Sequence, residues 1–107
     1  MTNQITESSG NVFADLGLAN AEEHLLKAGL VGKLAEVVRA LDISQTAAAK
    51  LTGISQPDLS RLLRGSFRDM SADRIIRALV RLGSDVEIEV TQKGKPVGDP
   101  IHLSAAA

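Results

Sequence analysis

One short stretch of the chain, LTGISQPDLSRLLRGS (residues 51–66), combines amide, hydroxyl and guanidinium side chains at helical spacing. Glutamine can form two hydrogen bonds with adenine, arginine can form two with guanine, and serine can bond a base or a phosphate. When the leucines of this stretch face inward, the residues that face outward are Gln56, Pro57, Ser60, Arg61 and Arg64. This face is therefore suited to hydrogen bonding with the edges of nucleic-acid bases.

Polar residues on either side of this face are suited to a second kind of contact, with phosphates. Gln45 begins the preceding helix, where a side chain and the helix N-terminus can both meet a phosphate. We expect base contacts from Gln56, Pro57, Ser60 and Arg61. We expect phosphate contacts from Ser44, Gln45, Ser55, Arg64, Ser66 and Arg68. The alternative is an ordinary solvated helix face, and we adopt it for Arg74, Arg77 and Arg81 on a later helix.

Two short helices must position these side chains. Ser44 is suited to cap a helix over 45–52, and Gly53 can end that helix in the left-handed conformation. Ser55 is suited to cap a second helix, with Asp58 as its capping-box partner. So short a connection fixes the angle between two helices, which is the arrangement of a helix-turn-helix. The second helix of that motif presents its N-terminal residues to the DNA major groove.

Apolar spacing extends this unit into one domain, which we expect over residues 12–91. The polar residues 1–11 are expected to be disordered, and residues 92–107 to form a turn and a loose tail. A helix over 21–41 has one apolar face at helical spacing. That face consists of Leu26, Leu30, Leu34, Val37 and Leu41. A helix over 72–82 follows, and the alternation in DVEIEVT predicts a half-buried strand over 85–91.

Composition excludes several classes of protein. The 107 residues fit one domain, and the absence of Cys removes disulfides, thiolate metal sites and Cys nucleophiles. No stretch approaches the length of a membrane span, and the N-terminus lacks the pattern of a signal peptide, so we expect a cytoplasmic protein without a membrane partner. His24 and His102 are interpreted as solvated side chains. We expect no enzyme, no metal and no cofactor.

Charge is unevenly distributed along the chain. The formal net charge is only −1, but residues 44–81 carry Lys50 and six arginines against three aspartates. The segments before and after this one are both acidic. A basic middle between acidic ends concentrates positive potential on one part of the surface. It coincides with the residues that we expect to contact bases and phosphates.

The segment SQTAAAKLTGISQPDLSRLLRG (residues 44–65) resembles the Xre/Cro-repressor family of helix-turn-helix proteins. With VFADLGLANAEEHLLKAGL before it and FRDMSADRIIRALVRLGSDVEIEV after it, residues 12–91 resemble the subgroup that includes HigA-type antitoxins. The resemblance implies a mainly α, lambda-repressor-like bundle of about five helices with one C-terminal strand. One departure is Thr52, where the family usually has an apolar residue beneath the turn, and we expect Leu51 to compensate.

The resemblance implies a dimer that binds double-stranded DNA at a palindromic operator and represses its own promoter. The dimer contact would come from the last helix and the strand, through Val86, Ile88 and Val90. A lone strand has unpaired edges, which a second chain can satisfy. The other solution is an intrachain hairpin with residues 97–103.

Two functions remain open at this point. The first is a sequence-specific transcriptional regulator, with or without an antitoxin role. The second is a protein-binding antitoxin module that sequesters a RelE-like toxin through residues 12–27, with DNA binding secondary. The resemblance supplies the toxin, because antitoxin members of the family neutralise a RelE-like ribonuclease.

Overall fold

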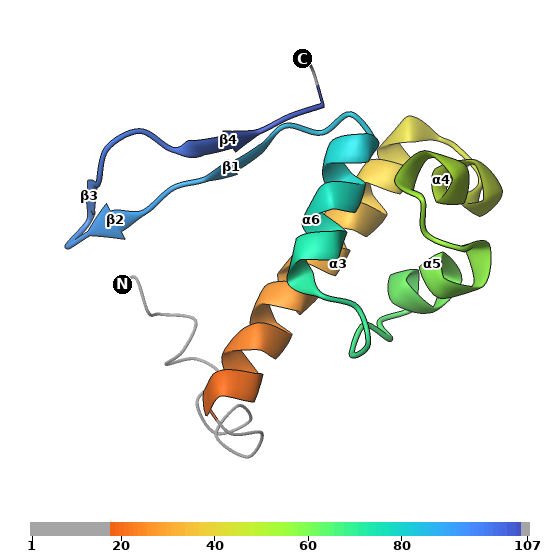
Figure 1. Cartoon of the computed structure of the whole chain (residues 1–107), viewed down its shortest axis with the longest axis horizontal. Coiled ribbons are helices and arrows are strands. Elements are labelled where there is room, and N and C mark those ends of the chain that lie inside the picture. Colours follow the sequence, from red (N-terminus) through yellow and green to blue (C-terminus); the bar gives the residue numbers. More distant parts are fainter. Residues whose placement is uncertain (1–17, 106–107) are drawn as a thin grey trace.

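A single long helix, α3 (Leu18–Leu41), organises the fold. The computed structural model describes residues 18–105, and three more helices follow α3 in this part of the chain. They are α4 (Gln45–Thr52), α5 (Gln56–Leu63) and α6 (Ala72–Arg81). In Figure 1, α6 lies along α3, α4 and α5 lie together on one side, and a β-hairpin extends on the other.

The described residues contain four helices, so the expectation of about five was wrong for this part of the chain. Gly29 and Gly32 do not interrupt α3, although each costs about 1 kcal/mol relative to Ala in a helix interior. Packing of one face against the rest of the domain outweighs that cost. Residues 1–11, which were expected to be disordered, and residues 12–17 of the expected domain lie outside the described residues.

The buried face of α3 agrees with the expected one only in part. Leu34 is fully buried, and Leu30 and Val37 pack against the core as partly buried residues. Leu26 and Leu41 are instead 53% and 43% exposed, and Val31 and Val38 are buried in their place. The two faces compete in the sequence because apolar residues nearly encircle the second half of the helix, and α5 and α6 select one of them by packing against it.

The core lies where α3, α5 and α6 meet. Leu34, Leu59, Leu62 and Ile75 are its largest fully buried side chains. Burying each contributes about 1.5–3 kcal/mol relative to exposure. Within the described residues, no helix combines the length and apolar composition needed to cross a bilayer.

The C-terminal segment forms an intrachain hairpin. Strand β1 (Val86–Ile88) pairs with β4 (Ile101–Leu103), and β2 (Thr91–Gln92) pairs with β3 (Lys95–Pro96), both antiparallel. Lys93 and Gly94 reverse the chain, both with positive φ as a type I′ turn requires. Of the two pairings considered for the strand, the structure shows the hairpin.

Two expectations about this segment were wrong. Residues 95–96 and 101–103 lie in strands rather than in a loose tail, because the turn at Lys93–Gly94 folds them back. The expected half-buried strand is buried only at its start, since Val86 packs on the core while Ile88 and Val90 are 39% and 54% exposed. The hairpin therefore leaves the helical body after β1 begins.

Candidate nucleic-acid interface

The turn between α4 and α5 is built as the sequence predicts. Gly53 ends α4 in the left-handed conformation, with φ 77° and ψ 11°, and its N–H donates to the carbonyl of Ala49 at 2.9 Å. A residue without Cβ adopts this conformation at low cost. Ser44 and Ser55 cap the two helices, as expected, and each hydroxyl oxygen accepts a backbone N–H within the first turn.

Thr52 fills the space beneath the turn with a polar side chain. It is 3% exposed, and its hydroxyl donates to the carbonyl of Ala48 at 2.8 Å. The same oxygen accepts the N–H of Ile54 at 3.3 Å. Leu51 is 52% exposed, so the expectation that it compensates for Thr52 was wrong. Hydrogen bonds across the turn take the place of the apolar contact.

Helix α5 is anchored by its inner face. Ile54, Leu59 and Leu62 are at most 2% exposed, so the two leucines face inward, as assumed from the sequence. Their burial turns the opposite face of α5 to solvent. Four of the five outward residues are exposed and Ser60 is half-buried; the exposed ones are Gln56, Pro57, Arg61 and Arg64.

Arg61 is held on this face by a neighbour on its own helix. Its guanidinium forms a hydrogen bond and ion pair with the carboxylate of Asp58, one turn earlier. The structure thus pairs this carboxylate with Arg61, a different partner from the one expected of a capping box. Both side chains remain exposed, and exposed ion pairs contribute little to stability. A base edge can therefore compete with Asp58 for the guanidinium.

The segment after α5 leaves the helix through a tight cap. Gly65 has φ 96°, Gly65 N–H donates to Leu62 at 3.0 Å, and Ser66 N–H donates to Arg61 at 2.9 Å. This is the hydrogen-bond pattern of a Schellman motif. It places Arg64, Ser66 and Arg68, the expected phosphate contacts, on an exposed segment next to the outer face of α5.

A buried lysine ties this segment to α3. Lys27 is 6% exposed, and its ammonium donates to the carbonyl of Arg68 at 3.2 Å and pairs with Glu23 at 3.2 Å. Beside it, the ring centroids of His24 and Phe67 lie 4.9 Å apart. Nothing in the sequence pattern indicated the contact of Lys27 with Arg68, because the two residues are 41 positions apart.

The capping serines keep a donor for a ligand. At Ser44 and Ser55 the hydroxyl oxygen accepts a backbone N–H of the capped helix. The hydroxyl hydrogen can still rotate toward a ligand and donate a hydrogen bond to it. Gln45 begins α4 and is exposed. The N-termini of both helices carry unsatisfied N–H groups and partial positive charge, which favour phosphate oxygens. Three of the six expected phosphate contacts, Ser44, Gln45 and Ser55, thus lie at helix ends that suit anions.

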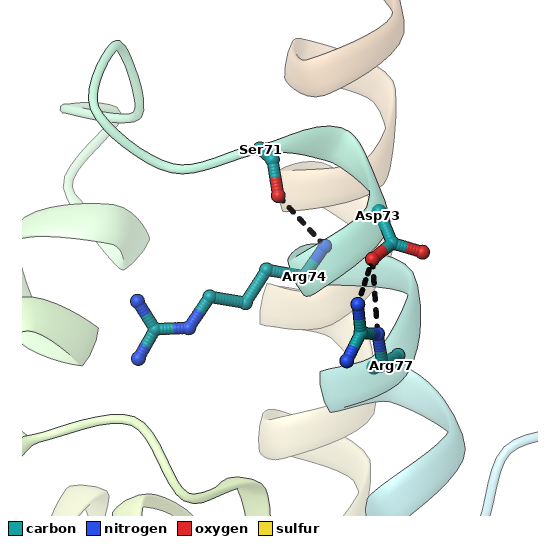
Figure 2. Close-up of polar contacts among 4 residues, drawn as sticks. All are labelled: Ser71, Asp73, Arg74 and Arg77. Atoms are coloured by element: carbon teal, nitrogen blue, oxygen red, sulfur yellow. Dashed lines mark hydrogen bonds and ion pairs between the residues drawn. The ribbon is translucent and has the colours of Figure 1, made fainter.

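Arginines of α6 border the turn. Figure 2 shows Ser71 capping α6 through the N–H of Arg74, and Asp73 pairing with Arg77. Asp73 raises the pKa of Arg77 above its ordinary value by hydrogen bonding and by its charge. Arg81 donates to the carbonyl of Thr52 at 2.9 Å. The solvated-face interpretation is therefore wrong for Arg81, whose partner lies 29 residues away in sequence.

The two histidines also have neighbours. His24 contacts Phe67, and His102 pairs with Glu87 at 3.0 Å across the hairpin, so neither is only a solvated side chain. Among residues 18–105, no three His, Cys, Asp or Glu side chains gather closely enough to hold a metal ion. The surface around α5 instead presents amide, hydroxyl and guanidinium groups on a helix whose inner face is buried in the core.

Comparisons with known proteins agree with this geometry. The family model described as a helix-turn-helix domain matches residues 12–91. A solved structure described as an XRE-family transcriptional regulator is similar, with a TM-score of 0.65 and 34% sequence identity. The similarity covers 80% of this chain and 98% of the other. No curated protein matches the chain.

Proposed function

The chain belongs to the helix-turn-helix domain family, which is a DNA-binding class. From that membership we propose that the protein is a sequence-specific transcriptional regulator that binds a palindromic operator as a homodimer. The observation that carries this proposal is the outer face of α5. It presents Gln56, Ser60 and Arg61 on a helix whose inner face is fixed by Leu59 and Leu62. A rigid helix with these side chains is suited to direct readout in the major groove.

Phosphate contacts position that helix in the proposal. The proposed phosphate contacts on the N-terminal side of α5 come from Ser44, Gln45 and Ser55. Those on its C-terminal side come from Arg64, Ser66 and Arg68. Lys27 and the cap at Gly65 fix the second group relative to α3. Contacts of this kind set register without reading sequence.

The dimer in this proposal forms through the hairpin. Residues directly opposite in an antiparallel ladder share a face, so Val86 with Leu103 and Ile88 with Ile101 form one apolar side. Val90 and Val97 extend this row, joined by a 2.8 Å backbone hydrogen bond. Five of the six are between 37% and 55% exposed. A two-stranded hairpin is marginal alone, and a second copy would cover this side.

A second candidate rests on the same exposed apolar side. A protein-binding antitoxin would use such a surface to hold a toxin of the RelE-like class. Leu26 on α3, which is 53% exposed, belongs to the N-terminal surface that the sequence indicated for this role. We rank this function second, because the polar face of α5 has no use in it.

The test is a titration of the purified protein on the DNA upstream of its own coding sequence, against a scrambled duplex, at two salt concentrations. The proposal predicts a preference for the upstream DNA and an affinity that falls as salt rises. In Arg68→Ala, affinity should fall alike on both duplexes, with a salt slope smaller by about one. Equal, salt-insensitive binding to both duplexes by the wild-type protein would refute the proposal.

A further inference from the structure

The guanidinium of Arg81 lies over the turn that joins α4 and α5. Its Nη1 donates to the carbonyl of Thr52 at 2.9 Å. A Cβ built on Gly53 would lie 2.7 Å from the same nitrogen, which is closer than van der Waals contact allows. The turn is therefore enclosed on two sides, by the hydroxyl of Thr52 beneath it and by Arg81 beside it.

This contact connects a fixed helix to the end of another. Helix α6 is anchored in the core by Ile75, Ala78 and Leu79, which are at most 4% exposed. The carbonyl of Thr52 is among the last four of α4 and has no partner within that helix. Arginine satisfies it with a charged donor at the negative end of the helix dipole.

We propose that Arg81 is a positioning residue for DNA recognition: by holding the last turn of α4 to α6, it fixes the angle at which α5 meets the major groove. The proposal rests on the function proposed above for α5. Arg81 itself reads no base. Without Arg81 the turn can shift. Such a shift would weaken the hydrogen bonds of α5 to base edges more than it would weaken contacts with phosphates.

A competing role for Arg81 is a phosphate contact of its own. A hollow of about 280 Å³ beside the turn is lined by Arg74, Arg77 and Arg81 together with Ser71. In Figure 2 the guanidinium of Arg74 extends away from α6, with no interaction drawn to the other labelled residues. The two roles differ in salt dependence, because only a phosphate contact releases counterions.

The experiment compares Arg81→Ala and Arg81→Lys with Arg77→Ala, a control one turn earlier on α6 whose guanidinium pairs with Asp73. The probes are the duplex that the wild-type protein selects from a random library and a scrambled duplex. Binding is measured at three salt concentrations, at a temperature where melting curves show every variant folded.

Arg81→Ala should bind the selected duplex roughly tenfold more weakly, as expected for the loss of one charged hydrogen bond, with scrambled-duplex affinity and salt slope unchanged. Arg81→Lys should recover part of the loss, because an ammonium can still donate to Thr52. Arg77→Ala should keep the discrimination of the wild type. Equal loss on both duplexes with a reduced salt slope would make Arg81 a phosphate contact and overturn the proposal, as would undiminished discrimination in Arg81→Ala.

A double-mutant cycle tests the geometry independently. In the wild type, Gly53→Ala adds left-handed strain and also forces Nη1, the end of the Arg81 side chain, away from the carbonyl of Thr52; in Arg81→Ala it adds only the strain. The fall in melting temperature caused by Gly53→Ala should therefore be smaller in the Arg81→Ala background. Equal falls in both backgrounds would overturn the contact. If the wild-type protein selects no duplex, the proposed function fails, whereas this cycle still reports on the contact.

Discussion

Thr52 shows how one buried polar side chain shapes the turn. Its hydroxyl bridges the carbonyl of Ala48 and the N–H of Ile54, and no buried side-chain nitrogen or oxygen lacks a partner among the described residues. The backbone N–H of Ile54 starts the chain toward α5. A hydroxyl at this position satisfies that N–H where an apolar side chain could not.

Replacing Thr52 with Val should destabilise the protein by about 1–3 kcal/mol, because the N–H of Ile54 would be left buried without a partner. Urea unfolding measures the change. Thr46→Val is the matched control, since Thr46 lies exposed in the first turn of the same helix and should change stability by less than about 0.5 kcal/mol. A Thr52→Val protein as stable as the control would show that the hydroxyl is dispensable.

The pairing of Arg61 with Asp58 also belongs to this scale. The pair is exposed, so opening it costs about 1 kcal/mol or less. A bidentate contact with guanine provides about 1–3 kcal/mol of discrimination. In the proposed function, exchange of Asp58 for guanine would therefore be favourable, whereas opening the pair at other bases would cost up to about 1 kcal/mol.

At the scale of elements, glycines with different backbone conformations should respond oppositely to the same substitution. Gly29 lies in the interior of α3 and Gly65 caps α5 with φ 96°, and a Cβ at either would have no atom within 4 Å. Gly29→Ala should stabilise by about 0.5–1 kcal/mol, and Gly65→Ala should destabilise by about 1 kcal/mol. Thermal unfolding of both variants gives the signs. The same sign for both would contradict the conformational argument.

The caps and the turn could be predicted because their signals are local. Ser44, Gly53 and Ser55 each act on residues within four positions, so the two helices and their inner face followed from spacing. The buried face of α3 was predicted only in part, because residues elsewhere in the chain decide that Val31 and Val38, rather than Leu26 and Leu41, are buried. Lys27 and Arg81 were missed for the same reason, since their partners lie 41 and 29 residues away.

At the scale of the whole molecule, the apolar side of the hairpin is the surface through which we propose that two copies associate. Ile88→Glu places a charge in the middle of that side, opposite Ile101. The wild-type protein should sediment as a dimer, and Ile88→Glu should weaken association at least about tenfold, because an interface core disfavours charge. Glu87→Gln alters the other face of the same strand and should sediment like the wild type.

A wild-type protein that sediments as a monomer at every concentration would refute the dimer. A dimer unaffected by Ile88→Glu would place the contact elsewhere. With two copies joined, two α5 helices would meet half-sites about 34 Å apart, one turn of DNA. In the proposed dimer, the symmetry of the operator would therefore depend on the hairpin as much as on α5.

The central claim is that the outer face of α5 reads DNA sequence, and the most direct test is base preference in Arg61→Ala. Wild type and variant would each select duplexes from a random library, and affinities for the selected duplexes would then be measured. We predict that Arg61→Ala loses preference at one base pair in each half-site and weakens specific binding by about 1–3 kcal/mol. A variant that keeps both the wild-type preference and the wild-type affinity would contradict the account.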